Sequence, residues 1–200
     1  FKLPRDLSEI GQQRFDVKQI HQLFQYTTEA SLKGYQQRLL MELIYGLGMS
    51  LARIVNIKSA IPELDEGRVR LYFQNSRYRD YPFSQPALNV LKSYLKLIDS
   101  IEGHNTFWIN KNAKALSSTQ LQNLLNKYFE AHDLPAINAN ELRDLSVQHF
   151  SQEGADVRSL QALRQFKQLR RLQSLNDSDF SHLQNSFKQK HLRSSVLNEE

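Results

Sequence analysis

The residues of this sequence best suited to chemistry are basic side chains concentrated in its last quarter. Between positions 158 and 193, eight lysines and arginines are accompanied by only two aspartates. Four of these basic residues have the spacing of one helical face: Arg164, Lys167, Arg170 and Arg171. Such a stripe attracts phosphate groups by charge and by the release of counterions, although an ordinary solvated helix face has the same pattern. The formal net charge of +5 agrees with an anionic partner without requiring one.

Other chemistries lack the residues that they need. The sequence has no cysteine, which excludes disulfides, zinc–thiolate sites and cysteine nucleophiles. Its six histidines are scattered, and no two lie three to five residues apart, so we expect neither a metal nor another cofactor. No apolar run approaches the roughly 18 residues that cross a bilayer, and no signal peptide is visible. We therefore expect a cytoplasmic protein without a membrane partner.

Apolar periodicity predicts the elements that position these residues. Helical spacing appears in seven segments: 16–24, 32–47, 51–57, 86–98, 117–129, 138–152 and the stretch from 156 onward. Pro62 is expected to close the first helical part. Residues 68–73 alternate between polar and apolar, and turn residues lead from them to a returning strand at 78–83. The sequence thus predicts an α+β fold, mostly α-helical with a small antiparallel sheet or hairpin.

Several segments resemble the catalytic domain of the tyrosine recombinase (phage integrase) family. Residues 40–49, LMELIYGLGM, are similar to the family's LLYGTGMR segment, especially as integron integrases have it. Residues 141–143 (ELR) and 152–158 (QEGADVR) are similar to the family's HxLRH…LLEAGADIR stretch, and 160–163 fall where the family has IQELLGH. The resemblance covers about 15–183 and implies the fold of the DNA breaking-rejoining enzymes.

The resemblance also implies a reaction. In this family a tyrosine attacks a DNA phosphodiester, which makes a phosphotyrosine link and frees a 5′ hydroxyl. Two arginines stabilise the charged phosphorane, a lysine on the β-hairpin protonates the leaving oxygen, and histidines assist. The physical basis is covalent catalysis with electrostatic stabilisation of a developing charge.

Most of the corresponding positions carry other residues in this sequence. Ser50 stands where the family has its first arginine, and Arg53 stands where an acidic residue follows that arginine. Gln74 falls at or near the position of the hairpin lysine, and Asn140 at that of the first histidine. Only the second arginine is retained, as Arg143.

The nucleophile is also missing. Phe166 falls at the late histidine, and the tyrosine position falls on Leu175 if no gap is allowed. With a short insertion it falls on Phe180, where residues 180–183, FSHL, resemble the family's Y-[TS]-H-[VL] motif. In either alignment no phosphotyrosine can form in the final third, because the last tyrosine of the sequence is Tyr128. The resemblance therefore implies a pseudo-enzyme.

The arginines at and near these positions are candidates for contact with DNA phosphates. Arg77 and Arg79 on the predicted hairpin suit backbone contact, although charges that protect a sheet edge have the same pattern. Arg143 could bind phosphate or pair with a neighbouring carboxylate. Arg53 could replace the absent first arginine or simply lie at the surface.

The resulting prediction is a domain at 15–176 that binds double-stranded DNA and does not cleave it. Residues 1–14 are expected to be a linker from a missing N-terminal core-binding domain, and the tail at 177–200 to dock on a second copy or an active recombinase. The expected role is that of an accessory or regulatory factor in recombination or integration of a mobile element, in the cytoplasm on the nucleoid. Two alternatives stay open: an active but divergent recombinase, and a protein-interaction module that no longer binds DNA.

Overall fold

The computed structural model describes residues 15–26, 29–63 and 67–152. Within them the elements are, in chain order, α1 (Val17–Gln25), α2 (Leu32–Met41), the π-helical turn η2 (Glu42–Gly46), α3 (Leu51–Ile54), β1 (Ile57–Glu63), β2 (Arg68–Phe73), β3 (Tyr78–Pro82), α4 (Gln85–Asp99), α5 (Ser118–Glu130) and α6 (Ala139–Gln152). The predicted class, mostly helical with a small antiparallel sheet, is confirmed. The linker predicted at 1–14 and everything predicted beyond position 152 lie outside the described residues.

The helices begin at residues that can satisfy their first free backbone N–H groups. Asp16 accepts a hydrogen bond from the third residue of α1, whose glutamine side chain bonds back to the Asp16 backbone. Ser117 makes the same capping box with α5, and Ser84 caps α4. Each cap of this kind stabilises a helix by about 1 kcal/mol. Because such residues can be recognised in the sequence, the predicted helix starts lie close to the observed ones.

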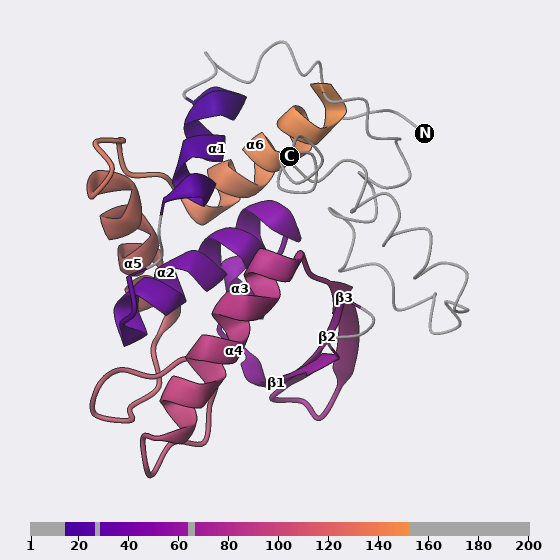
Figure 1. The fold of residues 1–200 in the computed structure, drawn as a ribbon, viewed down its shortest axis with the longest axis vertical. Helices are drawn as coiled ribbons and strands as arrows, with labels where there is room; N and C mark the ends of the chain where they lie inside the picture. Colours follow the sequence, from indigo (N-terminus) through magenta and orange to yellow (C-terminus); the bar gives the residue numbers. More distant parts are fainter. Residues whose placement is uncertain (1–14, 27–28, 64–66, 153–200) are drawn as a thin grey trace.

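Helix α2 is the centre of the helical part (Figure 1). It packs against α4 and α5, while the η2 turn that continues it packs against α6. Buried Arg38 on α2 donates hydrogen bonds to the carbonyls of Leu23 and Phe24, at 3.0 and 2.6 Å, and lies 3.4 Å from the Glu42 carboxylate. A buried guanidinium is tolerated only with such partners, so Arg38 ties the end of α1 to α2.

The three strands form an antiparallel sheet in the order β1-β2-β3. Side chains of β2 alternate between half-exposed and buried, as the sequence predicts. The predicted closure of a helical stretch at Pro62 is wrong, because residues 57–63 form strand β1. This strand lies at the edge of the sheet, where proline is tolerated because no neighbouring strand needs its missing N–H.

The helix predicted over 32–47 is two elements. The N–H of Leu47 bonds to the carbonyl five residues before it, at 3.1 Å, which gives the last turn its π-helical form. Gly48 then adopts φ 60°, a left-handed conformation that other residues reach only at a cost. The N–H of Met49 bonds back to Leu43 O at 2.9 Å and closes the helix end. This reversal carries the chain to Ser50 and α3.

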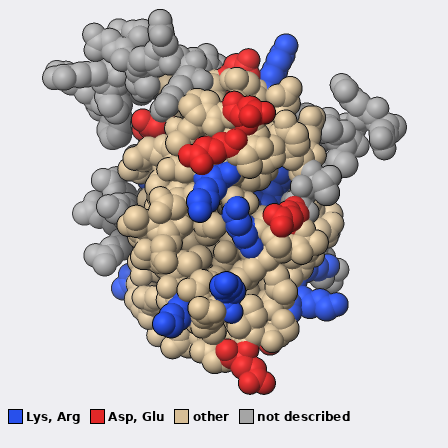
Figure 2. Space-filling view, turned by 90° about the vertical axis from the view of Figure 1, so that its left-hand side faces the viewer, with Lys and Arg blue, Asp and Glu red and all other residues tan. Residues whose placement is uncertain are grey.

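The surface on the α5 side of the molecule has mixed charge. Figure 2 shows lysines and arginines interspersed there with aspartates and glutamates, and neither sign gathers in one patch. In the part of the chain that the structure describes, no helix is both long and apolar enough to cross a membrane.

Candidate nucleic-acid interface

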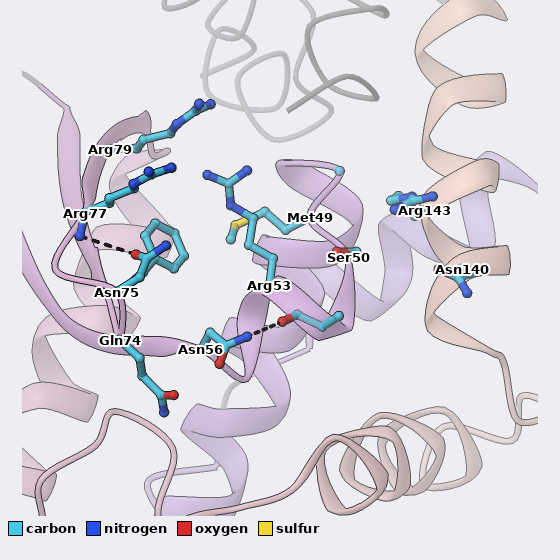
Figure 3. A pocket seen from close by; sticks show the side chains of 13 residues that line it. Met49, Ser50, Arg53, Asn56, Gln74, Asn75, Arg77, Arg79, Asn140 and Arg143 are labelled. Atoms are coloured by element: carbon cyan, nitrogen blue, oxygen red, sulfur yellow. Dashed lines mark hydrogen bonds between the residues drawn. The ribbon is translucent and has the colours of Figure 1, made fainter. Parts of the chain in front are cut away.

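A pocket of about 1090 Å³ opens between α3, the β2–β3 turn and α6 (Figure 3). It is lined by Gly48, Met49, Ser50, Ala52, Arg53, Asn56, Phe73, Gln74, Asn75, Arg77, Arg79, Asn140 and Arg143. Four residues that the sequence analysis placed at catalytic positions of the family line this one pocket: Ser50, Gln74, Asn140 and Arg143. They lie as far as 93 positions apart in the sequence, from 50 to 143. The fold brings them together.

The pocket lining is strongly basic. Among the described residues that line it are four arginines and no aspartate or glutamate. In Figure 3 the side chains of Arg53, Arg77 and Arg79 extend toward the same open side, and Arg143 lies across from them on α6. Cations gathered in a concave site raise the local positive potential, and guanidinium groups match phosphate oxygens in geometry as well as charge.

Other arginines of the sheet are neutralised. Arg70 donates hydrogen bonds to both carboxylate oxygens of Asp80, at 2.8 and 2.9 Å. A guanidinium nitrogen of Arg68 lies 3.8 Å from the same carboxylate. Neither arginine lines the pocket. Arg68 and Arg70 thus share the Asp80 carboxylate on the sheet, outside the pocket lining.

Helix α3 is fixed at its end by the core. The indole Nε1–H of buried Trp108 donates a hydrogen bond to the Ile54 carbonyl at 2.7 Å. The Asn56 side chain donates to the carbonyl of Ala52, also at 2.7 Å. Together with the Gly48 reversal at the other end, these bonds hold Ser50 and Arg53 in place. Trp108 itself belongs to the buried core.

Arg53 is half-buried in the pocket wall. Its Cζ atom lies 5.0 Å from the ring centre of Phe73 and 5.9 Å from that of Tyr81, in cation–π geometry. Burial lowers the pKa of Arg53, the Tyr81 side chain opposes this shift, and the positive charge of Arg79 adds to it. Even so, a guanidinium stays charged at neutral pH. Arg53 thus lies half-buried in the lining of the pocket, and whether it replaces the absent first arginine stays a prediction.

The β2–β3 turn is joined to α3 through the backbone. The Gln74 N–H donates a hydrogen bond to the Asn56 carbonyl at 3.0 Å, and Ser76 adopts φ 58° within the turn. The exposed Gln74 side chain points away from the arginines in Figure 3. Arg77, whose carbonyl accepts from the Phe73 N–H at 2.8 Å, points toward them instead. The turn therefore brings a cation to the pocket from Arg77, three residues beyond the predicted lysine position.

Helix α6 contributes Asn140 and Arg143. Arg143 is half-buried, and its Nε is buried without a hydrogen-bond partner among the described residues. The carboxylate of Glu141, two positions before Arg143 in the sequence, accepts a hydrogen bond from the Asn138 N–H at 3.1 Å. Arg143 thus brings to the pocket a partly desolvated donor group that an anion could satisfy.

A buried pair that the sequence did not suggest fixes α6 against η2. The Tyr45 hydroxyl and His149 Nδ1 are 2.9 Å apart in a hydrogen bond, and both side chains are buried. Burial lowers the pKa of His149; a hydrogen bond with the Phe15 backbone and the charge of Asp16 oppose this shift. Because α6 carries Arg143, this pair also helps to hold Arg143 in place relative to η2.

The structure reaches only part of the predicted site. The remaining predicted residues lie outside the part of the chain it describes: Arg164, Phe166, Lys167, Arg170, Arg171, Leu175 and Phe180. The same holds for the tail at 177–200. Conversely, the sequence prediction missed Asn56, Asn75 and the two rings beside Arg53. Asn75 stands in a turn that was predicted, next to a family position, and this was the one signal that could have indicated it.

Comparison with known proteins identifies the family of the chain. Residues 13–182 match the model of the phage integrase family, and the chain belongs to that family. The predicted membership is thereby confirmed.

Individual relatives are tyrosine recombinases. Tyrosine recombinase XerC of Alcanivorax borkumensis is 27% identical over 174 residues, which cover 84% of this chain and 56% of the relative. XerC of Staphylococcus carnosus is 26% identical over 152 residues, which cover 74% of this chain and 51% of the relative. The chain thus spans about half the length of these curated relatives.

Solved structures support the fold alone. The XerA recombinase superposes with a TM-score of 0.61 at 15% identity, covering 86% of this chain and 63% of that one. The XerH recombinase bound to its difH substrate superposes with a TM-score of 0.60 at 13% identity, covering 94% of this chain and 53% of that one. The predicted recombinase catalytic-domain fold is confirmed.

Proposed function

We propose that this chain binds double-stranded DNA by holding backbone phosphates in the arginine-lined pocket, and that it takes part in site-specific recombination without cleaving a strand. One observation carries the proposal. Four residues that the sequence analysis placed at catalytic positions of the family, Ser50, Gln74, Asn140 and Arg143, line a single pocket with Arg53, Arg77 and Arg79, and no carboxylate stands among the described residues of that lining. The pocket thus has the positive charge that attracts phosphate, whereas other residues stand where the family has the side chains that cleave DNA.

Phosphate is the ligand that this lining fits best. Guanidinium groups bind phosphate oxygens with two parallel hydrogen bonds, and each neutralised phosphate releases counterions from the duplex. The solved XerH recombinase is bound to its difH substrate, and the solved Tn1549 integrase is in complex with circular intermediate DNA. Family membership therefore supports duplex DNA as the source of the phosphates.

The missing cutting groups support an inactive role. Ser50, Gln74 and Asn140 are uncharged side chains at the positions of an arginine, a lysine and a histidine. Loss of even one group that stabilises a transition-state charge costs about 100- to 1000-fold in rate. The chain would then act as an accessory or regulatory factor of a mobile element, on DNA in the cytoplasm, beside a second copy or an active recombinase.

A gel-shift assay tests the DNA-binding part. Wild type, Arg143→Ala and Lys127→Ala are titrated against a short duplex at low salt; the exposed Lys127 lies on α5, outside the pocket. We expect Arg143→Ala to bind about tenfold more weakly, because a charge-assisted hydrogen bond is lost. Lys127→Ala should bind as wild type does. Failure of wild type to shift any duplex would overturn the proposal.

A suicide substrate tests the absence of cleavage. The protein is incubated with a nicked duplex that traps covalent intermediates of strand exchange, and the products are separated under denaturing conditions. We expect no protein–DNA adduct. An adduct would show that another residue acts as the nucleophile, and it would overturn inactivity while leaving DNA binding intact.

A further inference from the structure

We infer that Arg53 supplies the phosphate-binding charge that Ser50 lacks, so that Arg53 and Arg143 hold a DNA phosphate from two sides of Ser50. This inference rests on the proposed function and assigns a second binding residue within the same pocket. In the family, an arginine is followed three residues later by an acidic residue. In this chain the order is serine and then arginine, so the positive charge has moved by about one helical turn.

The geometry of α3 makes this replacement feasible. Ser50 is the N-cap residue of α3 and Arg53 is the third residue of that helix, and both line the pocket. Figure 3 shows the Arg53 guanidinium extended from α3 into the space that Arg77 and Arg79 also approach. Ser50 lies between Arg53 and Arg143 in the same view. The long Arg53 side chain thus places its charge in the same pocket that the short Ser50 side chain lines, on the side that Arg77 and Arg79 approach.

Two aromatic rings hold Arg53 in this position. Phe73, at 5.0 Å, belongs to β2, and Tyr81, at 5.9 Å, belongs to β3. Contacts with both strands restrict the rotamers of the side chain before any ligand arrives. A group that is already ordered loses less conformational entropy on binding, which raises affinity. This ordering by the two rings is expected of a side chain that binds a ligand, and it is not expected of an arginine on the solvated surface.

The electrostatic surroundings point the same way. Burial and the nearby positive charge of Arg79 both disfavour the charged form of Arg53, although Tyr81 partly compensates. Since arginine keeps its charge at neutral pH, the free pocket holds cations that repel one another. An anion bound between them removes that repulsion, so the arrangement favours a phosphate over a neutral ligand.

An exchange of residues tests the inference in the full chain. The affinity for a fluorescent duplex is measured by anisotropy for wild type, Arg53→Glu and the double variant Ser50→Arg/Arg53→Glu, which restores the family order. We expect Arg53→Glu to weaken binding at least about tenfold, and Ser50→Arg to restore it to within about threefold of wild type.

The matched control separates local geometry from total charge. Arg77→Glu and Ser50→Arg/Arg77→Glu change the net charge by the same amounts. If Arg53 does what a residue at position 50 would do, Ser50→Arg should rescue Arg53→Glu and leave Arg77→Glu weak. Equal rescue of both variants, or wild-type affinity of Arg53→Glu, would overturn the inference.

Loss of the ring contacts could also unfold the protein, so the unfolding midpoint of each variant is measured beside its affinity. If Arg53→Glu does not fold, Arg53→Gln replaces it, because glutamine keeps part of the aliphatic stem without the charge. Comparison with Arg143→Ala also distinguishes a failure of this inference from a failure of the proposed function. If Arg143→Ala weakens binding and the neutral or reversed Arg53 variant does not, only the inference fails. If wild type binds no duplex, the proposed function fails first.

Discussion

His149 illustrates how burial controls a single titratable residue in this protein. Its imidazole is fully buried and hydrogen-bonds the Tyr45 hydroxyl. The desolvation that lowers its pKa outweighs the opposing contributions of the Phe15 backbone and Asp16, and the nearby His21 acts in the same direction as burial. The folded protein therefore favours the neutral imidazole, the form whose ring nitrogens include an acceptor as well as a donor.

This burial predicts a loss of stability in mild acid. In the unfolded chain the histidine pKa is about 6.5, and in the folded protein it is lower, so below about 6.5 the unfolded state binds more protons. The contribution of His149 is fully present above that pH and declines as the pH falls toward the folded pKa. We expect the free energy of unfolding to fall between about pH 7.5 and about pH 5.5, and to fall less in His149→Gln.

Urea titrations followed by the fluorescence of Trp108, the single tryptophan, measure this difference. Glutamine can still hydrogen-bond Tyr45 but does not titrate. An equal drop in the wild type and in His149→Gln would show that other groups cause the pH dependence.

Among the elements, those with undisturbed periodicity could be predicted and those with an irregularity could not. Strand β2 keeps strict alternation and was predicted. In β1 the pairing shifts between Ile57 and Ser59, so buried Ile57 and Ala60 are three residues apart, which is a helical spacing. The shift in pairing thus removes the alternation by which a strand is recognised in the sequence. Pro62 is in addition typical of a helix end, so the segment was assigned to the helical part.

The π-helical turn escaped prediction for a related reason. The apolar residues of 39–47 fit an ordinary helix, and a single widened turn does not alter that pattern visibly. What the sequence does contain is Gly48, whose left-handed conformation ends the helix and directs the chain into α3. The position of Arg53 therefore depends on a backbone reversal that only glycine makes without strain.

Gly48→Ala should consequently destabilise the protein. A residue with a Cβ atom pays about 1–2 kcal/mol to adopt the left-handed conformation, so we expect a loss of that size in the free energy of unfolding. Gly103→Ala is a useful comparison, because Gly103 also has a positive φ, 81°, in a loop away from the pocket with no atoms close to a new Cβ. Both variants should lose stability in urea, but only Gly48→Ala should also lose affinity for DNA. Unchanged DNA affinity in Gly48→Ala would contradict the view that this reversal positions the site.

At the scale of the whole molecule, the family positions of the site could be predicted and its full lining could not. Ser50, Gln74, Asn140 and Arg143 were found through motifs whose order along the chain is that of the family. Asn56 and the rings beside Arg53 have no chemical signature of their own, and only tertiary packing makes them part of the pocket. Net charge was equally uninformative, because a value of +5 does not say where the cations lie: the α5 side has mixed charge (Figure 2), whereas four arginines line the pocket.

This concentration predicts a specific dependence of DNA binding on salt. Each phosphate that a basic side chain neutralises contributes about 0.9 to the slope of log affinity against log salt concentration. We expect Arg77→Ala/Arg79→Ala to reduce the magnitude of that slope by about 1.8, because both residues line the pocket. The double variant should therefore bind much more weakly than wild type at low salt, and the difference should shrink as salt rises.

The control removes the same charge from elsewhere. Lys92 and Lys96 are exposed on α4, outside the pocket lining, and Lys92→Ala/Lys96→Ala should leave the slope at its wild-type value. Anisotropy titrations at four or more salt concentrations give the slope of each protein. If both double variants reduced the slope equally, DNA would be responding to the net charge of the molecule, and the pocket would have no special part in binding. A slope that changes only for the pocket variant would mean that the phosphates are held by these arginines in particular.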